Sequence, residues 1–87
     1  KAALEKFMSQ HRHKSKLIQV NIIDQWPKIA GTTISSRTDR LWIKNRALHI
    51  VISSSVLKNE LQYHKEKLVE RVNNTVGIDH ITDIIIH

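Results

Sequence analysis

The sequence of 87 residues is long enough for one small domain, and its 40% hydrophobic and 25% charged residues are typical of a compact fold. The absence of cysteine excludes disulfide bonds, thiolate metal sites and cysteine nucleophiles. The formal net charge of +6 favours a polyanionic partner, with nucleic acid first and an anionic membrane surface second. Because no segment reaches about 18 uninterrupted apolar residues, we expect a soluble, cytoplasmic protein that does not enter a membrane.

The basic charge is concentrated in residues 1–46. This half carries ten Lys or Arg against three acidic residues, whereas residues 47–87 carry four against five. A polyanion is therefore expected to bind the first half of the chain.

The first residues are predicted to form a short helix over residues 2–9, because Leu4, Phe7 and Met8 share one helical face. The polar sequence QHRHKS is then expected to interrupt the helix. Residues 1–15 would thus be an N-terminal helix and basic linker, and residues 16–87 would be the core of a single domain.

A second helix is predicted from Ser15, a residue type that caps helix N-termini. Pro27 is expected to kink or restart this helix, and Gly31 is expected to end it. The segment TTISSRTDR has no strong period, so we expect a loop with at most a short extended or helical piece near Ile34.

The sequence RLWIKNRALHIVIS alternates apolar and polar residues and predicts two antiparallel strands. A two-residue turn at residues 45–46 would place Ile43 opposite Leu48 and Leu41 opposite Ile50. Both strands would then direct their apolar side chains to the same face.

The C-terminal part is predicted to be one long helix over residues 54–76, followed by Gly77 and a last strand. The buried stripe of the helix consists of Leu57, Leu61, Leu68, Val72 and Val76. The strand sequence HITDIIIH is nearly continuously apolar, which indicates a well-covered strand in the same sheet. The predicted order is α-α-β-β-α-β, an α+β domain with a three-stranded sheet packed on helices.

The serine run at residues 53–55 does not indicate catalysis, because the glycines of a nucleophile elbow are missing. A helix cap is the main interpretation, and an anion contact at the helix N-terminus is the alternative. His11 and His13 have no carboxylate beside them, so they are expected to supplement a basic surface rather than to bind a metal. No cofactor or small-molecule substrate is expected.

Trp42 alternates out of the apolar face between Arg40 and Lys44, where it could stack on a base. Packing under a helix or at a subunit contact is the alternative. If the basic residues contact phosphates, binding will be largely independent of sequence and steeply dependent on salt. The candidate nucleic-acid site consists of Arg12, Lys14, Lys16, Lys28, Arg37, Arg40, Trp42, Lys44 and Arg46.

Five features occur in a characteristic order: the pattern Trp26-x-x-Ile29-x-Gly31, the hairpin leading into LHIVISSS, the sequence LKNEL, a helix ending near Asn73 and Gly77, and the closing ITDIII. Over residues 17–86 this order resembles the DciA family of bacterial replicative-helicase loaders, in particular the short members common in Bacteroidota.

The resemblance implies a KH-like domain, located with the nucleoid, that binds DNA and helps to place the replicative helicase on it without enzymatic activity. The two glycines are isolated, so the GxxG loop with which KH domains clamp a nucleic-acid backbone is missing. Binding is therefore expected through the basic surface and Trp42.

We thus expect a non-enzymatic accessory whose partners are the replicative helicase and DNA, either single-stranded or as a tailed duplex. An RNA-binding KH-like module is one alternative. A protein-interaction adaptor whose basic face meets an acidic partner is the other.

Overall fold

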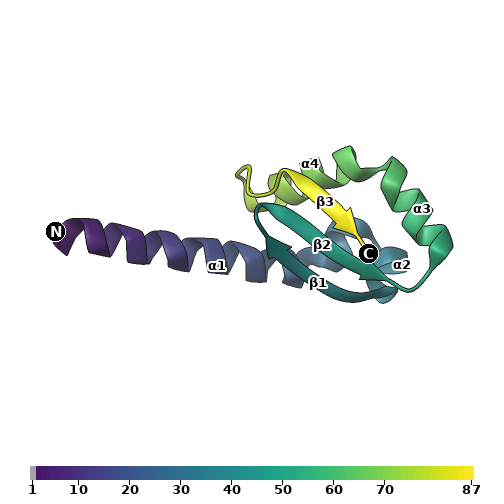
Figure 1. Ribbon diagram of the computed structural model, residues 1–87, viewed down its shortest axis with the longest axis horizontal. Helices are drawn as coiled ribbons and strands as arrows, with labels where there is room; N and C mark the ends of the chain where they lie inside the picture. The colour runs from purple at the N-terminus through teal and green to yellow at the C-terminus, as the bar shows by residue number, and fades with distance from the viewer. Residues whose placement is uncertain (1) are drawn as a thin grey trace.

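The computed structural model describes the backbone of residues 2–87 and the side chains of residues 16–87. Figure 1 shows a small α+β body from which the N-terminal helix projects. The elements in chain order are α1 (Ala2–Ala30), α2 (Thr32–Ser36), β1 (Thr38–Lys44), β2 (Ala47–Ile52), α3 (Ser55–Tyr63), α4 (Lys65–Val76) and β3 (Asp83–Ile86). The predicted α+β class with a three-stranded sheet is confirmed.

The N-terminal helix α1 is continuous, so the predicted linker over residues 10–15 is wrong and Ser15 lies inside the helix rather than at its start. The linker sequence is polar and basic but contains neither glycine nor proline, so it changes the polarity of the helix without breaking it. The helix continues past Pro27 for one turn. It ends at Gly31, whose φ of 91° is readily adopted only by glycine.

The short helix α2 confirms the helical piece predicted near Ile34. Ile34 packs against the core, and its carbonyl oxygen accepts a hydrogen bond of 2.7 Å from the Thr38 hydroxyl. Thr38 in turn accepts a hydrogen bond of 3.0 Å from the indole N–H of Trp26. These bonds fix α2 and the start of β1 against α1, and they satisfy the polar atom of a buried tryptophan.

The antiparallel hairpin of β1 and β2 has the predicted register, with Leu41 opposite Ile50 and Ile43 opposite Leu48. The turn residues Asn45 and Arg46 have φ values of 52° and 62°. Two consecutive left-handed residues are the geometry of a tight hairpin turn that matches the twist of the strands. The predicted two-residue turn is confirmed.

The predicted long helix is wrong, because the chain bends at His64 and forms α3 and α4 instead. The backbone of His64 leaves the helical region with φ −112° and ψ 16°, and its N–H donates to the Leu61 carbonyl at 3.1 Å. The bend falls where the apolar stripe is interrupted by polar residues. It lets Leu61 from α3 and Leu68 from α4 both enter the core.

The helices α3 and α4 form the crossover that a parallel strand pair requires. β3 pairs in parallel with β2, so the strand order is β1-β2-β3. The Ser54 hydroxyl accepts a hydrogen bond of 3.3 Å from the Leu57 N–H, which confirms the predicted serine cap at the start of α3.

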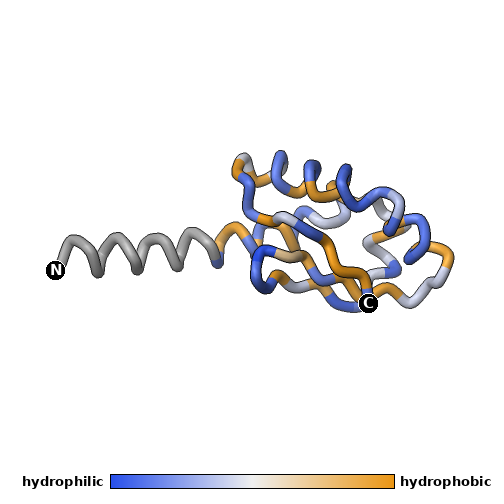
Figure 2. The backbone as a smooth tube through the Cα atoms, turned by 45° about the horizontal axis from the view of Figure 1, so that its top comes forward, coloured by the Kyte–Doolittle hydropathy of each residue, from blue (hydrophilic) through white to orange (hydrophobic). Residues whose placement is uncertain are grey.

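The core lies between one face of the sheet and the helices. Figure 2 shows apolar positions recurring along the strands and along the described part of α1. Ile85 points to the other face and is exposed, so the prediction of a well-covered last strand is wrong for that face. The buried cluster consists of Ile22, Trp26, Ile29, Leu48, Ile50, Ile52, Leu61, Leu68, Val72, Ile81 and Ile84.

Among the described residues, no helix combines the length and the hydropathy needed to cross a membrane.

Candidate nucleic-acid interface

The face of the sheet that points away from the core carries a row of side chains across all three strands. Trp42 in β1 is opposite His49 in β2, and His49 is opposite Ile85 in β3. Because side chains alternate along a strand, Arg40 and Lys44 share this face with Trp42. We call this surface the open sheet face. Its members are Arg40, Trp42, Lys44, His49, Val51, Asp83, Ile85 and His87.

Three aromatic rings lie nearly parallel to one another on this face. The ring centroids of Trp42 and His49 are 5.0 Å apart with an interplanar angle of 8°. The His87 ring lies 5.4 Å from Trp42 and 5.3 Å from His49, at angles of 19° and 16°. We call Trp42, His49 and His87 the ring cluster. A hydrogen bond of 3.0 Å between His49 Nδ1 and His87 Nε2 joins its two imidazoles.

Arg40 lies directly beside the ring cluster. Its guanidinium carbon is 5.0 Å from the Trp42 ring centroid, a distance at which a cation is attracted by the π system. Lys44, four residues further along β1, is exposed. The aromatic surface is therefore flanked by two cations on one strand, about 13 Å apart by the rise of an extended chain.

The surroundings of Trp42 exclude one alternative, packing under a helix, within the described part of the chain. Its neighbours Leu41 and Ile43 pack against the core, whereas Trp42 contacts Arg40 and the two imidazoles on the opposite face. Trp42 is thus not packed under a helix of its own domain.

The remaining predicted basic residues are not gathered on this face. Lys16 and Lys28 are exposed on α1, whose apolar side packs on the other face of the sheet. Arg37 is exposed between α2 and β1. Arg46 is engaged in the fold, because its Nη2 donates a hydrogen bond of 2.8 Å to the Asp79 carbonyl.

The side chains of Arg12 and Lys14, like those of His11 and His13, lie outside the described residues. Of the predicted site, the structure therefore brings together Arg40, Trp42 and Lys44. It adds His49 and His87, which are not among the predicted site residues. The alternation of β1 and β2 already places His49 opposite Trp42, whereas nothing local indicates His87.

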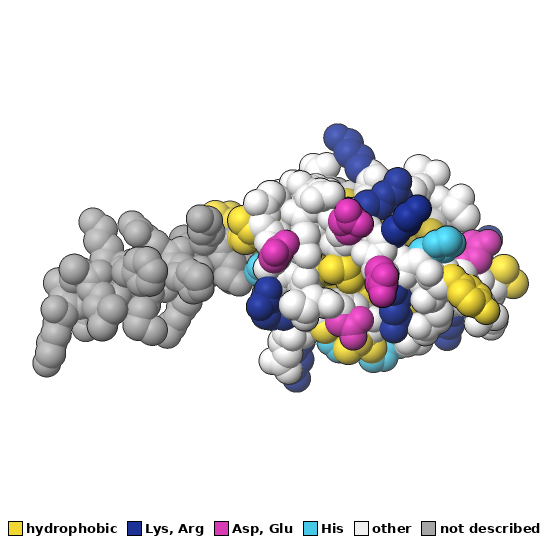
Figure 3. Space-filling view, turned by 90° about the horizontal axis from the view of Figure 1, so that it is seen from above, with side chains coloured by type: hydrophobic (Ala, Val, Ile, Leu, Met, Phe, Trp, Pro, Cys, Tyr) yellow, Lys and Arg dark blue, Asp and Glu magenta, His cyan; other side chains and the backbone are white. Residues whose placement is uncertain are grey.

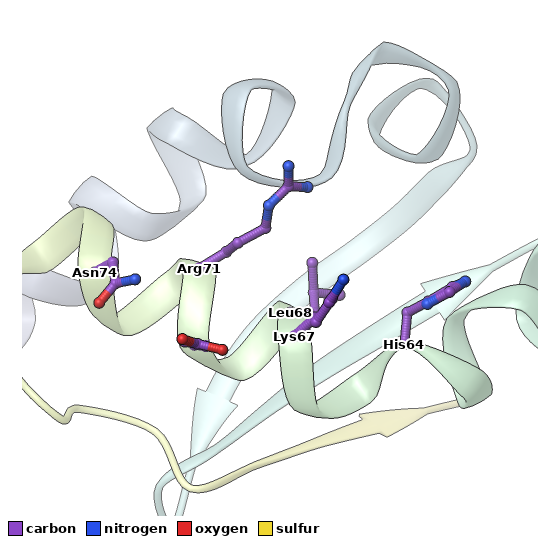
Figure 4. Close-up of a pocket in the computed structure, with 6 residues that line it drawn as sticks. His64, Lys67, Leu68, Arg71 and Asn74 are labelled. Carbon is purple, nitrogen blue, oxygen red and sulfur yellow. The ribbon is translucent and has the colours of Figure 1, made fainter.

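The helical side of the molecule offers a different surface. A groove of about 460 Å³ runs along α4 and is lined by His64, Lys67, Leu68, Glu70, Arg71 and Asn74 (Figure 4). Arg71 extends from it and donates a hydrogen bond of 3.2 Å to the Ile29 carbonyl at the C-terminal end of α1. That carbonyl lacks a partner within its own helix and carries partial negative charge, so Arg71 stabilises the packing of α1 on α4.

The charges on this helical side are mixed. Glu70 lines the α4 groove together with Lys67 and Arg71. Figure 3 shows acidic and basic side chains interleaved on the side of the molecule where α3 and α4 lie. A surface of alternating sign attracts a polyanion less than the cations of β1 do.

His80 lies in the connection between α4 and β3 and does not add to the basic surface. Burial, and secondly the positive charge of Arg46, lower the pKa of His80 below its usual value of 6.5. Its Nε2 atom is buried without a hydrogen-bond partner among the described residues. The imidazole is therefore neutral at pH 7.

Metal binding has no support in residues 16–87, where no three His, Asp or Glu side chains lie close enough together to hold an ion.

The family model described as "Dna[CI] antecedent, DciA" matches residues 1–86. No curated protein is similar enough to be matched. The family match thus covers all of α1, including the N-terminal residues that the resemblance over residues 17–86 left out.

Proposed function

Because the chain belongs to the DciA family, we propose that it is a non-enzymatic, DNA-binding accessory that helps to load the bacterial replicative helicase onto DNA. The family is associated with helicase loading. In this proposal the whole chain acts as one KH-like domain at the nucleoid. Its partners are the helicase and DNA that is single-stranded or a tailed duplex.

The observation that carries the DNA-binding part of the proposal is the arrangement on β1. Arg40 and Lys44 flank Trp42 on a sheet face that is not packed against the core, so that phosphates and bases can reach all three side chains. The other predicted cations are not members of the open sheet face, so in this proposal they add long-range attraction for DNA. They are Arg12, Lys14, Lys16, Lys28, Arg37 and Arg46.

The serine run supports a role without catalysis. The Ser54 hydroxyl is engaged as the N-cap of α3, where it accepts the Leu57 N–H. A hydroxyl in this position satisfies a free backbone amide and stabilises a helix. Capping of α3 is thus sufficient to explain the serine at position 54, between β2 and α3.

The test is a titration of fluorescent tailed duplex DNA at several salt concentrations, with RNA of the same sequence in parallel. Each phosphate contact on a single strand contributes about −0.7 to the slope of log K, the binding constant, against log salt. Contacts by Arg40 and Lys44 alone therefore predict a slope of about −1.4 or steeper. If micromolar protein causes no change in the fluorescence of the DNA at any salt concentration, DNA binding is refuted. Tighter binding of RNA would favour the RNA-binding alternative.

The role in helicase loading needs a second measurement. Purified helicase of the same bacterium is expected to be retained by the immobilised protein, and a fork-shaped DNA is expected to increase the retained amount. If no helicase is retained with or without DNA, the loading part of the proposal is wrong and only a DNA-binding module remains.

A second candidate function is that of a protein-interaction adaptor, and the surface of α1 favours it. Leu17 and Val20 are 65% and 57% exposed, and Ile23, also exposed, continues the same side of the helix. Exposed apolar side chains at this spacing are typical of helix faces that contact another protein.

The contact with the helicase and the contact with DNA can be separated by a double substitution on α1. Leu17→Glu with Val20→Glu is expected to weaken helicase retention while DNA affinity stays within about twofold, because both side chains are exposed and neither belongs to the open sheet face. Val56→Glu on α3 is the control, since Val56 is an apolar residue that is 71% exposed on another helix. Equal retention for all three proteins would remove the adaptor surface from α1.

A further inference from the structure

We infer that the open sheet face recognises the unpaired bases of a single strand, which stack in the ring cluster of Trp42, His49 and His87. The inference rests on the proposed function, because it concerns the same face. It goes further in that phosphate contacts alone do not distinguish a single strand from a duplex. The two histidines become part of the binding site.

The geometry of the rings supports stacking. The three planes are parallel to within 8° to 19°, and neighbouring centroids are 5.0 to 5.4 Å apart. The imidazoles of His49 and His87 lie edge to edge, joined by their hydrogen bond, and both are parallel to Trp42, so a further flat ring can stack on the face of Trp42 that points away from them. Aromatic side chains on the face of a sheet bind single-stranded nucleic acid in this way, since every base has a π face.

The ring cluster is held in place before any ligand binds. The imidazoles of His49 and His87 are joined by their 3.0 Å hydrogen bond, and the backbone N–H of His87 donates to the Ile50 carbonyl at 2.8 Å. His49 lies within β2 and opposite Trp42. Rings fixed in this manner lose little conformational entropy when a base stacks on them.

Arg40 explains how a base can enter. Its guanidinium lies over the Trp42 ring at 5.0 Å, where it occupies the position of a stacked base. The side chain is exposed and long, so it can leave the ring and bind the phosphate next to the entering base. Arg40 would then exchange one favourable contact for another.

The charge distribution on the open sheet face gives the strand a path. Lys44, Ala47 and Asp83 form one row across the sheet, so the carboxylate lies on β3, at the edge opposite to the cations of β1. Asp83 repels phosphates, whereas Arg40 and Lys44 attract them. The backbone of the strand is therefore expected to follow β1, with its bases turned toward the ring cluster.

Duplex DNA does not meet these conditions, because each base inside it is already stacked between its neighbours. A single strand or the unpaired tail of a duplex presents free base faces. The open sheet face should therefore prefer DNA with unpaired nucleotides.

The test compares two single strands that carry the same number of phosphates, an oligothymidylate and an abasic strand of equal length, at one salt concentration. The wild-type protein is expected to bind the base-containing strand at least about fivefold more tightly, since stacking contributes about 1 to 3 kcal/mol per base. Only that strand should quench the tryptophan fluorescence. Trp26 is buried and bonded to Thr38, so the change reports on Trp42.

Two matched variants locate the effect. Trp42→Leu is expected to lower the affinity for oligothymidylate to that of the abasic strand and to leave the abasic affinity unchanged. Tyr63→Leu removes an aromatic ring that is 87% exposed at the end of α3, and it should change neither affinity.

The outcomes separate this inference from the proposed function. Equal affinities for both strands, with unchanged fluorescence, would overturn stacking and leave phosphate binding intact. An affinity loss in Tyr63→Leu instead of Trp42→Leu would place the bases elsewhere and overturn it as well. If neither strand binds, DNA binding and base stacking are both wrong.

Discussion

Replacing Asn73 with alanine is expected to destabilise the fold by about 2.5 kcal/mol, because one side chain holds the connection between α4 and β3. The Asn73 Oδ1 accepts hydrogen bonds of 3.0 Å from the N–H groups of His80 and Ile81. Its Nδ2 donates a hydrogen bond of 2.9 Å to the Ile81 carbonyl. Ile81 is in the core, directly before the strand that places His87 in the ring cluster.

The magnitude follows from these three bonds. Each contributes about 1 kcal/mol to stability, and the substitution leaves three backbone groups without their partner. Alanine regains about 0.5 kcal/mol because it has a higher helix propensity than asparagine. The net loss of about 2.5 kcal/mol corresponds to a decrease in Tm of about 10 to 20 °C for a domain of this size.

The assay is urea unfolding followed by far-ultraviolet circular dichroism, with free energies from linear extrapolation. Asn74→Ala is the matched control, because Asn74 is the adjacent asparagine of the same helix and is exposed. Asn74→Ala should gain the same stability from helix propensity, and it keeps the three hydrogen bonds of Asn73. If the two variants unfold within about 0.5 kcal/mol of each other, Asn73 does not hold the connection in the way described.

Three further predictions concern stability. The pKa of His80 is lowered in the folded protein, so the unfolded chain binds a proton first as the pH falls below 6.5. The wild type should therefore lose more free energy of unfolding than His80→Gln between about pH 7.5 and 5.5. Equal losses in both proteins would contradict this. Ser54→Ala should cost about 1 kcal/mol by urea unfolding, whereas Ser53→Ala, at an exposed position before the cap, should cost less than about 0.5 kcal/mol. Gly77→Ala should lower the unfolding free energy by about 1 kcal/mol through its φ of 76° alone, since a Cβ there meets no atom within 4 Å; an unchanged Tm would argue against the left-handed cap.

The hairpin could be predicted because its determinants are local. Alternation over residues 40–53 and a two-residue turn are enough to set the register, and the same register places His49 opposite Trp42. The capping serine and the two helix-ending glycines are equally local signals. These elements appear in the structure where the sequence indicates them.

The bend at His64 could not be predicted, because neither glycine nor proline marks it. The apolar stripe has the same helical period on both sides of the bend, so a straight helix and two helices fit it equally well. The choice is made by packing, since Leu61 and Leu68 must both reach the core above a short sheet. Tertiary contacts thus override the local preference of this segment.

The candidate site was predictable only in its β1 part. Charge counted along the sequence assigns ten basic residues to the first half, but among the described ones Lys16 and Lys28 lie on α1, away from the open sheet face that carries Arg40 and Lys44. His87 joins Trp42 through the parallel pairing of β2 and β3, a contact between segments far apart in the chain. Such pairings cannot be derived from alternation within one strand.

The most direct test of the central claim, that DNA binds the open sheet face, compares two charge reversals of equal size. One protein carries Arg40→Glu with Lys44→Glu, and the other carries Lys65→Glu with Lys67→Glu in the first turn of α4, where acidic residues suit the helix dipole. Both double substitutions lower the net charge by the same amount. A difference between their affinities for the same fluorescent tailed DNA therefore reports on where the cations lie and not on the total charge. The reversal on β1 is expected to weaken binding at least about tenfold more than the reversal on α4. Equal affinities of the two proteins would contradict the claim.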